Sequence, residues 1–141
     1  MSDKQKIIRI LITEDDDGHA ELITEGLRDT GVSNEIIRFN DGLELWEYLN
    51  SAVEKSLEED FLILLDINMP RMDGVETLEL IKKHPNMKDI PVIMLTTTDD
   101  QREVDKCYQL GCNVYITKPI NFTLFAETLK RIGLFIQIMK V

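Results

Sequence analysis

The chain has 141 residues, which suits one domain with one well-formed hydrophobic core. Hydrophobic residues make up 43% of the sequence and charged residues 30%, and the net charge is -10. Because nucleic-acid-binding proteins usually carry a basic patch or stripe, this acidity argues against direct binding of nucleic acid. It argues equally against docking on an anionic membrane surface.

The sequence predicts no targeting or membrane segment. The apolar run Ile7–Ile12 is too short for a signal peptide or a membrane span, and Arg9 interrupts it. Cys107 and Cys112 lie five positions apart, a poor match to the spacing of redox and zinc motifs. We therefore expect two reduced thiols in a cytoplasmic protein, and a single domain over residues 1–141.

Short apolar runs alternate with stretches of helical periodicity along the chain. The five runs are Ile7–Ile12, Glu35–Phe39, Phe61–Leu65, Val92–Leu95 and Asn113–Ile116. Helical stripes of apolar residues follow them, over Ala20–Leu27, Leu45–Val53, Val75–Ile81, Val104–Tyr108 and Phe125–Met139. This alternation predicts an α/β fold, with a doubly wound parallel sheet of five strands and helices on both faces. The polar stretch Ser51–Asp60 is predicted to be a loop.

Charged and hydroxyl-bearing residues stand where the predicted strands end. Glu14 and Asp15 follow the first strand, Asp66 the third, Thr96 the fourth and Lys118 the fifth. In a parallel sheet, ligands bind beyond these carboxyl ends, near the point where strand order reverses. If the first and third strands are neighbours, the three carboxylates converge and repel each other. A hard cation such as Mg²⁺ compensates this repulsion, because it prefers carboxylate, carbonyl and water oxygens.

This arrangement predicts a role for each group. We expect Asp15 and Asp66 to bind the cation directly, Glu14 to act through water, and Asn68 to supply its backbone carbonyl. Asp66 is placed to attack phosphorus and form an aspartyl phosphate. Phosphoryl transfer depends mainly on positioning and on neutralising charge. Lys118 can supply a point charge opposite the cation, and the Thr96 hydroxyl can donate a hydrogen bond to a phosphoryl oxygen.

Simpler interpretations apply to three other residues with polar side chains. Asp16 is predicted to be the N-cap of the first helix. His19 lies about one turn into that helix and is predicted to face solvent, with a role beside the metal as the less favoured alternative. His84 stands before Pro85, where a helix is expected to end.

Four sequence blocks together resemble the receiver domain of two-component response regulators over almost the whole chain. They are Ile10–Asp16, Leu65–Gly74, Pro91–Thr96 and Tyr115–Pro119, in that order. The resemblance implies a flavodoxin-like receiver fold with strand order 2-1-3-4-5. It also implies a signalling protein rather than an enzyme with an external substrate, phosphorylated by a sensor histidine kinase with Mg (or Mn) bound.

Residue roles follow from the same resemblance. It makes Asp66 the phosphoacceptor, Glu14 and Asp15 the acidic pair, Asn68 a metal ligand through its carbonyl, Thr96 the switch hydroxyl, Lys118 the phosphoryl contact and Tyr115 the switch aromatic. Asn68 and Thr98 are expected to tune the rate at which the phosphoryl group is hydrolysed. The Lys118–Pro119 bond resembles the family's cis peptide, which would aim the lysine into the pocket.

The C-terminal part is similar to the stand-alone regulators that pair with bacterial phytochromes. Those proteins have no output domain and often pair through the last helix and its extension. Here an apolar helix or tail continues over about residues 133–141. The predicted partner or homodimer face comprises Tyr108, Tyr115, Phe125, Leu134, Phe135 and Met139. The alternative is a helix end that folds back onto its own core.

Three other functions fit the same fold. A haloacid-dehalogenase-type phosphatase usually needs a second aspartate two residues after the nucleophile, and position 68 is asparagine. A flavodoxin-like or dinucleotide-binding module usually has glycines after the first strand, where this chain has the acidic run Glu14–Asp17. An unphosphorylated docking adaptor is disfavoured by the intact set of Asp66, Thr96 and Lys118.

Overall fold

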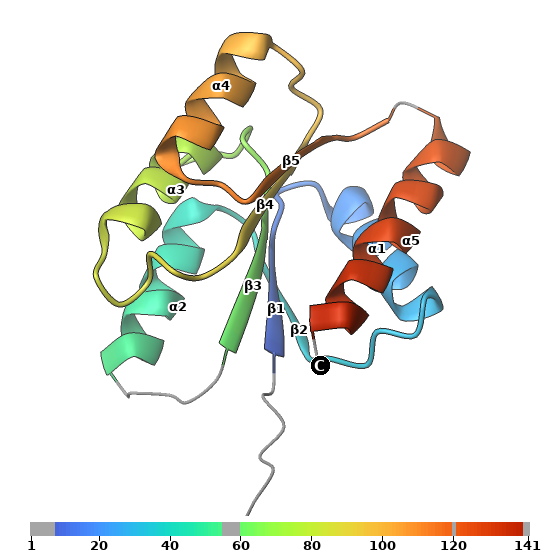
Figure 1. The fold of residues 1–141 in the computed structure, drawn as a ribbon, viewed down its shortest axis with the longest axis horizontal. Helices are drawn as coiled ribbons and strands as arrows, with labels where there is room; N and C mark the ends of the chain where they lie inside the picture. Colours follow the sequence, from blue (N-terminus) through green and yellow to red (C-terminus); the bar gives the residue numbers. More distant parts are fainter. Residues whose placement is uncertain (1–7, 55–59, 120, 140–141) are drawn as a thin grey trace, which may run out of the picture.

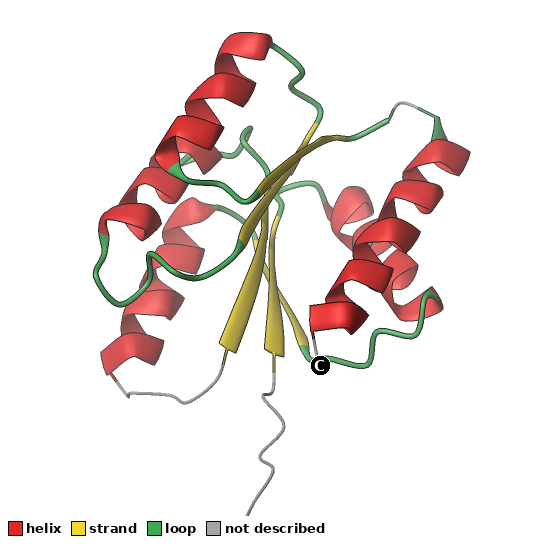
Figure 2. Cartoon of the chain, viewed as in Figure 1, coloured by secondary structure: helices red, strands yellow, loops and turns green. Residues whose placement is uncertain are grey.

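The computed structural model describes residues 8–54, 60–119 and 121–139. Within these ranges strands and helices alternate strictly in chain order (Figures 1 and 2). The strands are β1 (Ile8–Thr13), β2 (Ile36–Phe39), β3 (Asp60–Leu65), β4 (Val92–Thr96) and β5 (Val114–Thr117). The helices are α1 (Asp17–Asp29), α2 (Gly42–Glu54), α3 (Gly74–Lys83), α4 (Gln101–Leu110) and α5 (Phe122–Met139).

The strands form one parallel sheet in the order β2-β1-β3-β4-β5. This order confirms the predicted doubly wound, flavodoxin-like fold. The strand order reverses at β1, which has β2 on one side and β3 on the other. In the register of β1 and β3, Thr13 pairs with Leu65. The next residues, Glu14 and Asp66, therefore leave the sheet side by side at its carboxyl edge.

Helices cover both faces of the sheet, with α1 and α5 on one face and α2, α3 and α4 on the other (Figure 1). Successive strand residues alternate between two hydrophobic layers. Leu11 and Ile63 pack with α2–α4, whereas Ile10 and Leu62 pack with α1 and α5, and all four are fully buried. Each such side chain contributes roughly 1.5–3 kcal/mol when it is buried. The strands are therefore almost uninterrupted apolar runs.

Helix ends follow local sequence signals. Asp16 is the N-cap of α1, as predicted, and its carboxylate accepts a hydrogen bond from the amide of His19 at 2.9 Å. α3 ends at Lys83, shortly before Pro85. Gly111 ends α4 with a positive φ of 110°, a conformation that glycine adopts without steric cost.

The predicted loop Ser51–Asp60 is shorter than expected. α2 continues to Glu54, because Ala52 extends the buried stripe of Leu45 and Leu49 by another turn. Asp60 already belongs to β3, and residues 55–59 lie outside the described ranges. Ile7, the predicted start of the first strand, also lies outside them. Across the described ranges, no helix combines the length and apolar character that a membrane crossing requires.

The long helix α5 lies against α1 along one face (Figure 1). Ile132 and Ile136 are buried, and the side-chain amide of Gln137 donates a hydrogen bond to the carbonyl of Thr30 at 2.5 Å. The large apolar residues exposed on α5 are Leu124, Leu134, Phe135 and Ile138. One face of α5 thus packs on its own domain, while another presents apolar side chains to solvent.

Candidate metal centre and acceptor aspartate

Three carboxylates from neighbouring strand ends converge at the carboxyl edge of the sheet. One oxygen each of Glu14, Asp15 and Asp66 lies within 4.8 Å of the other two. The amide of Asp66 donates to the carbonyl of Thr13 at 3.1 Å, so the ladder between β1 and β3 extends to the aspartate itself. Glu14 and Asp66 are buried, whereas Asp15 is exposed. A cluster of hard oxygen donors that is open on one side fits a divalent cation that keeps water ligands.

The buried position of Glu14 makes its charge costly. Burial raises the pKa of Glu14 to about 7, with the charge of Asp66 adding to the rise and the hydrogen bond from Lys118 opposing it. A carboxyl group with a pKa of about 7 is only partly ionised at neutral pH, because the positive charge of Lys118 does not fully compensate its burial. A divalent cation between the carboxylates would supply that charge, which is a second reason why the donor set fits a metal.

Lys118 reaches the same carboxylates from the end of β5. Its ammonium donates a hydrogen bond to Oε1 of Glu14, and Nζ lies 3.4 Å from Oδ2 of Asp66. The amide of Lys118 donates to the carbonyl of Thr96 at 2.7 Å, which aligns the lysine with the end of β4. The side chain of Lys118 is only 3% exposed, so its charge acts on the pocket rather than on solvent.

The predicted cis peptide at Lys118–Pro119 is wrong for this structure. No cis peptide bond occurs in the described residues, which include both members of this pair. Trans is the favoured isomer even before proline, and Lys118 contacts Glu14 and Asp66 with the bond in that form.

His19 lies beside the carboxylates, although its side chain is 40% exposed. Its Nδ1 atom is 3.1 Å from Nζ of Lys118 and 3.8 Å from Oε1 of Glu14. The ring also contacts Phe125 edge-on, with 6.5 Å between the centroids. The prediction that His19 faces solvent therefore describes only part of its surroundings. The sequence signal was its position about one turn into the first helix, close to the acidic strand end.

Thr98 connects the loop after β3 with β5. Its hydroxyl accepts a hydrogen bond from the side-chain amide of Asn68 at 3.0 Å, and its carbonyl accepts one from the hydroxyl of Tyr115. Its amide lies 3.4 Å from the hydroxyl oxygen of Thr96, which is fully buried at the end of β4. The backbone amide of Asn68 in turn donates to Oδ1 of Asp66 at 3.4 Å. Polar contacts therefore link the two predicted rate-tuning residues to the predicted switch residues.

Tyr115 is half-buried on β5 and contacts α4 as well as the loop after β4. Its amide donates a hydrogen bond to the hydroxyl of Tyr108 on α4 at 3.0 Å. Burial raises the pKa of Tyr115 to about 12, so the phenol stays protonated and acts as a donor at neutral pH. The phenol of Tyr115 is therefore held by the β4–α4 loop, while its backbone is held by α4.

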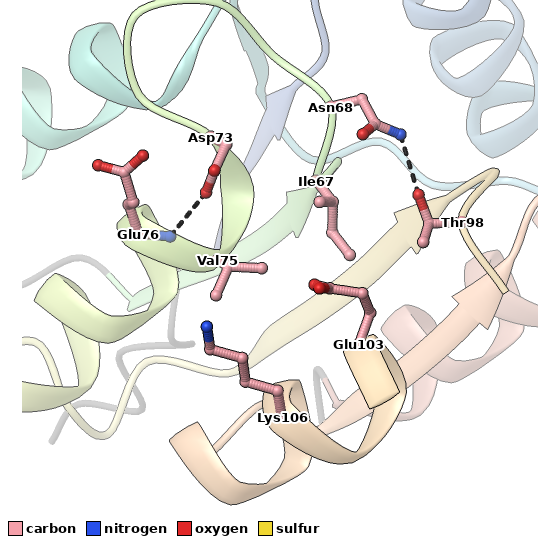
Figure 3. A pocket seen from close by; sticks show the side chains of 8 residues that line it. All are labelled: Ile67, Asn68, Asp73, Val75, Glu76, Thr98, Glu103 and Lys106. Carbon is pink, nitrogen blue, oxygen red and sulfur yellow. Dashed lines mark hydrogen bonds between the residues drawn. The ribbon is translucent and has the colours of Figure 1, made fainter. Parts of the chain in front are cut away.

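A cavity of about 390 Å³ opens next to the acidic cluster, between the β3–α3 loop and α4 (Figure 3). Its walls are Ile67, Asn68, Asp73, Val75, Glu76, Thr98, Glu103 and Lys106. Figure 3 shows that the hydrogen bond from Asn68 to Thr98 forms one edge, while Glu103 and Lys106 extend from α4 toward α3. Displacement of Thr98 would therefore reshape the cavity.

The fold and the site together define a receiver. Residues 10–130 match the response regulator receiver domain family, and the chain belongs to this family. It is 38% identical over 113 residues to the response regulator Rcp1 of Synechocystis sp., covering 79% of this chain and 77% of Rcp1. Members of the family act in two-component signalling, so this chain is a signalling protein related to phytochrome response regulators.

Solved structures support the same assignment. A response regulator receiver domain from Rhodospirillum rubrum is 47% identical, with a TM-score of 0.88 over 94% of this chain and 96% of that chain. The phosphorylated cyanobacterial phytochrome response regulator RcpA is 36% identical, with a TM-score of 0.82 over 90% and 91%. The Mn²⁺-bound form of Rcp1 has the same identity and TM-score, over 90% and 92%.

Proposed function

We propose that this chain is a stand-alone response regulator that accepts a phosphoryl group on Asp66 from a sensor histidine kinase. The observation that supports this proposal most directly is the surroundings of Asp66. Two further carboxylates lie within 4.8 Å, and the ammonium of Lys118 is 3.4 Å from Oδ2. The related regulator RcpA has been solved in a phosphorylated form, and Rcp1 with Mn²⁺.

In the proposed reaction, a carboxylate oxygen of Asp66 forms a bond to phosphorus as the bond from phosphorus to the kinase histidine breaks. The electron pair of the broken bond leaves on the histidine nitrogen. Asp15, Asp66 and the carbonyl of Asn68 would hold Mg²⁺ (or Mn²⁺), with Glu14 acting through water, and the cation would neutralise charge on the transferred group. Lys118 neutralises the opposite side.

Phosphorylation is proposed to shift an equilibrium between two conformers. Lys118 leaves Glu14 for a phosphoryl oxygen, and the Thr96 hydroxyl donates to another. Because the amide of Thr98 lies 3.4 Å from that hydroxyl, the β4–α4 loop follows, and Tyr115 moves with the carbonyl that it binds. The surface formed by α4, β5 and α5 then changes its affinity for a partner.

Acetyl phosphate with Mg²⁺ tests the acceptor directly. We expect the intact protein to gain one phosphoryl mass, and Asp66→Asn to abolish that gain. Asp60→Asn is a matched control, because Asp60 lies at the opposite end of the same strand. Labelling that persists in Asp66→Asn would place the acceptor elsewhere. A wild-type protein that is never labelled would favour the docking adaptor.

A bacterial phytochrome is the proposed kinase partner, since Rcp1 and RcpA resemble this chain over most of their length. Transfer from the autophosphorylated phytochrome kinase to the purified chain tests this pairing. The expected result is loss of label from the kinase and gain on Asp66, faster than from an unrelated histidine kinase. Equal rates from both kinases would contradict the pairing.

The proposed homodimer face lies on the outer side of α5 and on α4. Leu134, Phe135 and Tyr108 are 49%, 46% and 48% exposed. Phe125 does not belong to this face, because its ring is only 6% exposed and packs with the α1 side of the core. Tyr115 is half-buried beside Tyr108. The side chain of Met139 lies outside what the structure describes.

A further inference from the structure

The end of β2 and its connection to α2 contain none of the proposed metal ligands, yet they contact both loops that carry them. At the end of β2, Nε and Nη2 of Arg38 donate hydrogen bonds to the carbonyl of Glu14 at 3.0 and 2.9 Å. Nη1 of Arg38 also donates to the carboxylate of Asp17 at 2.6 Å. One guanidinium therefore spans the turn between β1 and α1, with Asp15 between its two contacts. The backbone that presents Glu14 and Asp15 is fixed from the β2 side.

Asp41 makes the second contact, to the loop between β3 and α3. Its Oδ1 atom accepts the amide of Glu44 at 3.0 Å and so caps α2, while Oδ2 accepts Nε of Arg71 at 2.6 Å. The carboxylate of Asp41 is 5% exposed. Although burial raises its pKa, the hydrogen bonds from Arg71 and from the Glu44 amide outweigh that effect, and the pKa lies below the usual range. Asp41 is therefore a buried, ionised anchor whose cationic partner is Arg71.

The loop held by this ion pair is strained at the same residue. Arg71 has a φ of 63°, and it is the one residue other than glycine with a positive φ in the described ranges. The amide of Met72 donates to the carbonyl of Pro70 at 2.7 Å, which closes a tight turn around Arg71. Such a conformation persists where surrounding contacts impose it. Here those contacts are the Arg71–Asp41 pair and the hydrogen bond from the Gly42 amide to the Met72 carbonyl at 3.2 Å.

The same loop is fixed at its two ends. Gly74 lies so close to the strand end that an added Cβ would come within 2.1 Å of the Asp66 carbonyl, and its amide donates to the carbonyl of Ile67. Asn68 lies between these fixed points and Arg71. Only Met69 and Pro70 separate Asn68 from Arg71, and the φ of a proline is fixed by its ring, so a shift of Arg71 is transmitted to the carbonyl of Asn68.

We propose that Arg38 and Asp41 are positioning residues for the metal site: Arg38 holds the β1–α1 turn through the Glu14 carbonyl, and Asp41 holds the β3–α3 loop through Arg71. This inference rests on the proposed function for the identity of the metal ligands. Neither residue contacts the cation or the phosphoryl group. They keep two separate ligand-bearing loops in the binding geometry before the metal arrives, so that binding does not have to order them.

Magnesium affinity, measured by calorimetry on the full chain, tests the proposal without any phosphorylation. The variants are Arg38→Gln and Arg71→Gly, the latter because glycine accepts the positive φ while losing the side chain that pairs with Asp41. We expect each to weaken Mg²⁺ binding by about tenfold, in the range seen for residues that orient metal ligands. Arg102→Gln is the matched control, because Arg102 pairs with Asp100 at 3.1 Å on the exposed start of α4. It should bind Mg²⁺ as the wild type does.

A purely structural role gives a different pattern. Thermal melting in EDTA reports the stability of each variant, and labelling by acetyl phosphate reports the acceptor. If Arg38→Gln and Arg71→Gly melt earlier but bind Mg²⁺ as tightly as the wild type, the proposal is overturned. The expected labelling rate at saturating Mg²⁺ is within about twofold of the wild type, because only the affinity changes. Wild-type protein that binds Mg²⁺ but is not labelled would refute the proposed function while leaving this test intact.

Discussion

The hydroxyl of Tyr115 donates a hydrogen bond to the backbone carbonyl of Thr98, in the loop that follows the buried Thr96. The two residues are 17 positions apart in sequence. The hydroxyl of Thr98 accepts a hydrogen bond from the side-chain amide of Asn68. The aromatic ring on β5 is therefore connected, through Thr98, to the loop that follows Asp66, the proposed acceptor. These two hydrogen bonds join that loop to the surface between α4 and β5.

Tyr115→Phe removes this hydrogen bond and keeps the ring. We expect the unfolding free energy to fall by about 1 kcal/mol, the usual net value of one hydrogen bond. The carbonyl of Thr98 loses a partner in a half-buried loop, which is why the change is not smaller. Urea unfolding followed by the fluorescence of the single tryptophan, Trp46, measures the difference. Stability equal to that of the wild type would show that water replaces the hydroxyl and that the connection is weak.

Alkaline titration gives an independent test of Tyr115. Burial raises its pKa to about 12, above the ordinary value of 10. Because the folded pKa is raised, the contribution of the protonated phenol is fully present below about pH 10 and is lost as pH rises through 12. Ultraviolet absorbance of tyrosinate should therefore show a late phase that Tyr115→Phe lacks. A wild-type titration without that phase would contradict the buried position.

Asn68→Ala removes the side-chain contact to Thr98 but keeps the backbone carbonyl that is proposed to bind the cation. We expect the phosphorylated protein to lose its phosphoryl group about threefold faster, a factor of the size that one weak hydrogen bond supplies. The physical reason is that the Asn68 side chain and Thr98 together form one edge of the cavity, next to the Asn68 backbone amide that lies 3.4 Å from Oδ1 of Asp66. Decay of phosphoprotein after removal of acetyl phosphate measures the rate. Thr98→Ala should give a similar acceleration, and a rate unchanged in both variants would contradict a role in tuning.

Most of the fold and the strand-end residues could be predicted because they follow from short-range patterns. Apolar runs such as Leu62–Leu65 identify buried parallel strands, and the residues directly after them must lie at one edge. The prediction that Phe125 belongs to the partner face was wrong because the pattern does not say which apolar residues of a helix are buried. Leu124 and Phe125 are adjacent apolar residues on one helix, and only packing decides that Phe125 enters the core while Leu124 is 52% exposed.

The residues that brace the site could not be predicted in this way. Arg38 and Asp41 are charged residues outside the four family blocks, and Arg71 lies in the loop part of one block; a solvated side chain is the usual expectation for each. Their contacts depend on the positive φ of Arg71 and on how closely the β2–α2 and β3–α3 connections approach. Neither property has a local sequence signal. His19 differs, since its position near the acidic strand end raised a role beside the metal as the less favoured alternative, and the structure places its Nδ1 3.1 Å from Nζ of Lys118.

Glu14 makes the stability of the metal-free protein depend on pH. Burial raises its pKa to about 7 from 4.5, so the neutral form is favoured by folding. Its contribution is therefore fully present below pH 4.5 and is lost as pH rises through 7. Glu14→Gln keeps the shape and stays neutral. In EDTA, we expect the free energy of unfolding of the wild type to fall on the order of 2 kcal/mol relative to that of this variant as the pH rises from acidic to weakly alkaline. Parallel stability curves for the two proteins would contradict the raised pKa.

Leu134→Glu and Phe135→Glu test whether α5 forms a homodimer face. Both side chains are about half exposed on a helix whose other side is already occupied by its own core, so they are free to contact a second copy. A carboxylate placed in the centre of an apolar interface should weaken association by at least about tenfold. Light scattering with and without beryllofluoride measures the oligomeric state. Leu124→Glu is the matched control, because this exposed leucine lies at the other end of α5. If all three variants associate like the wild type, the exposed apolar end of α5 serves a different partner.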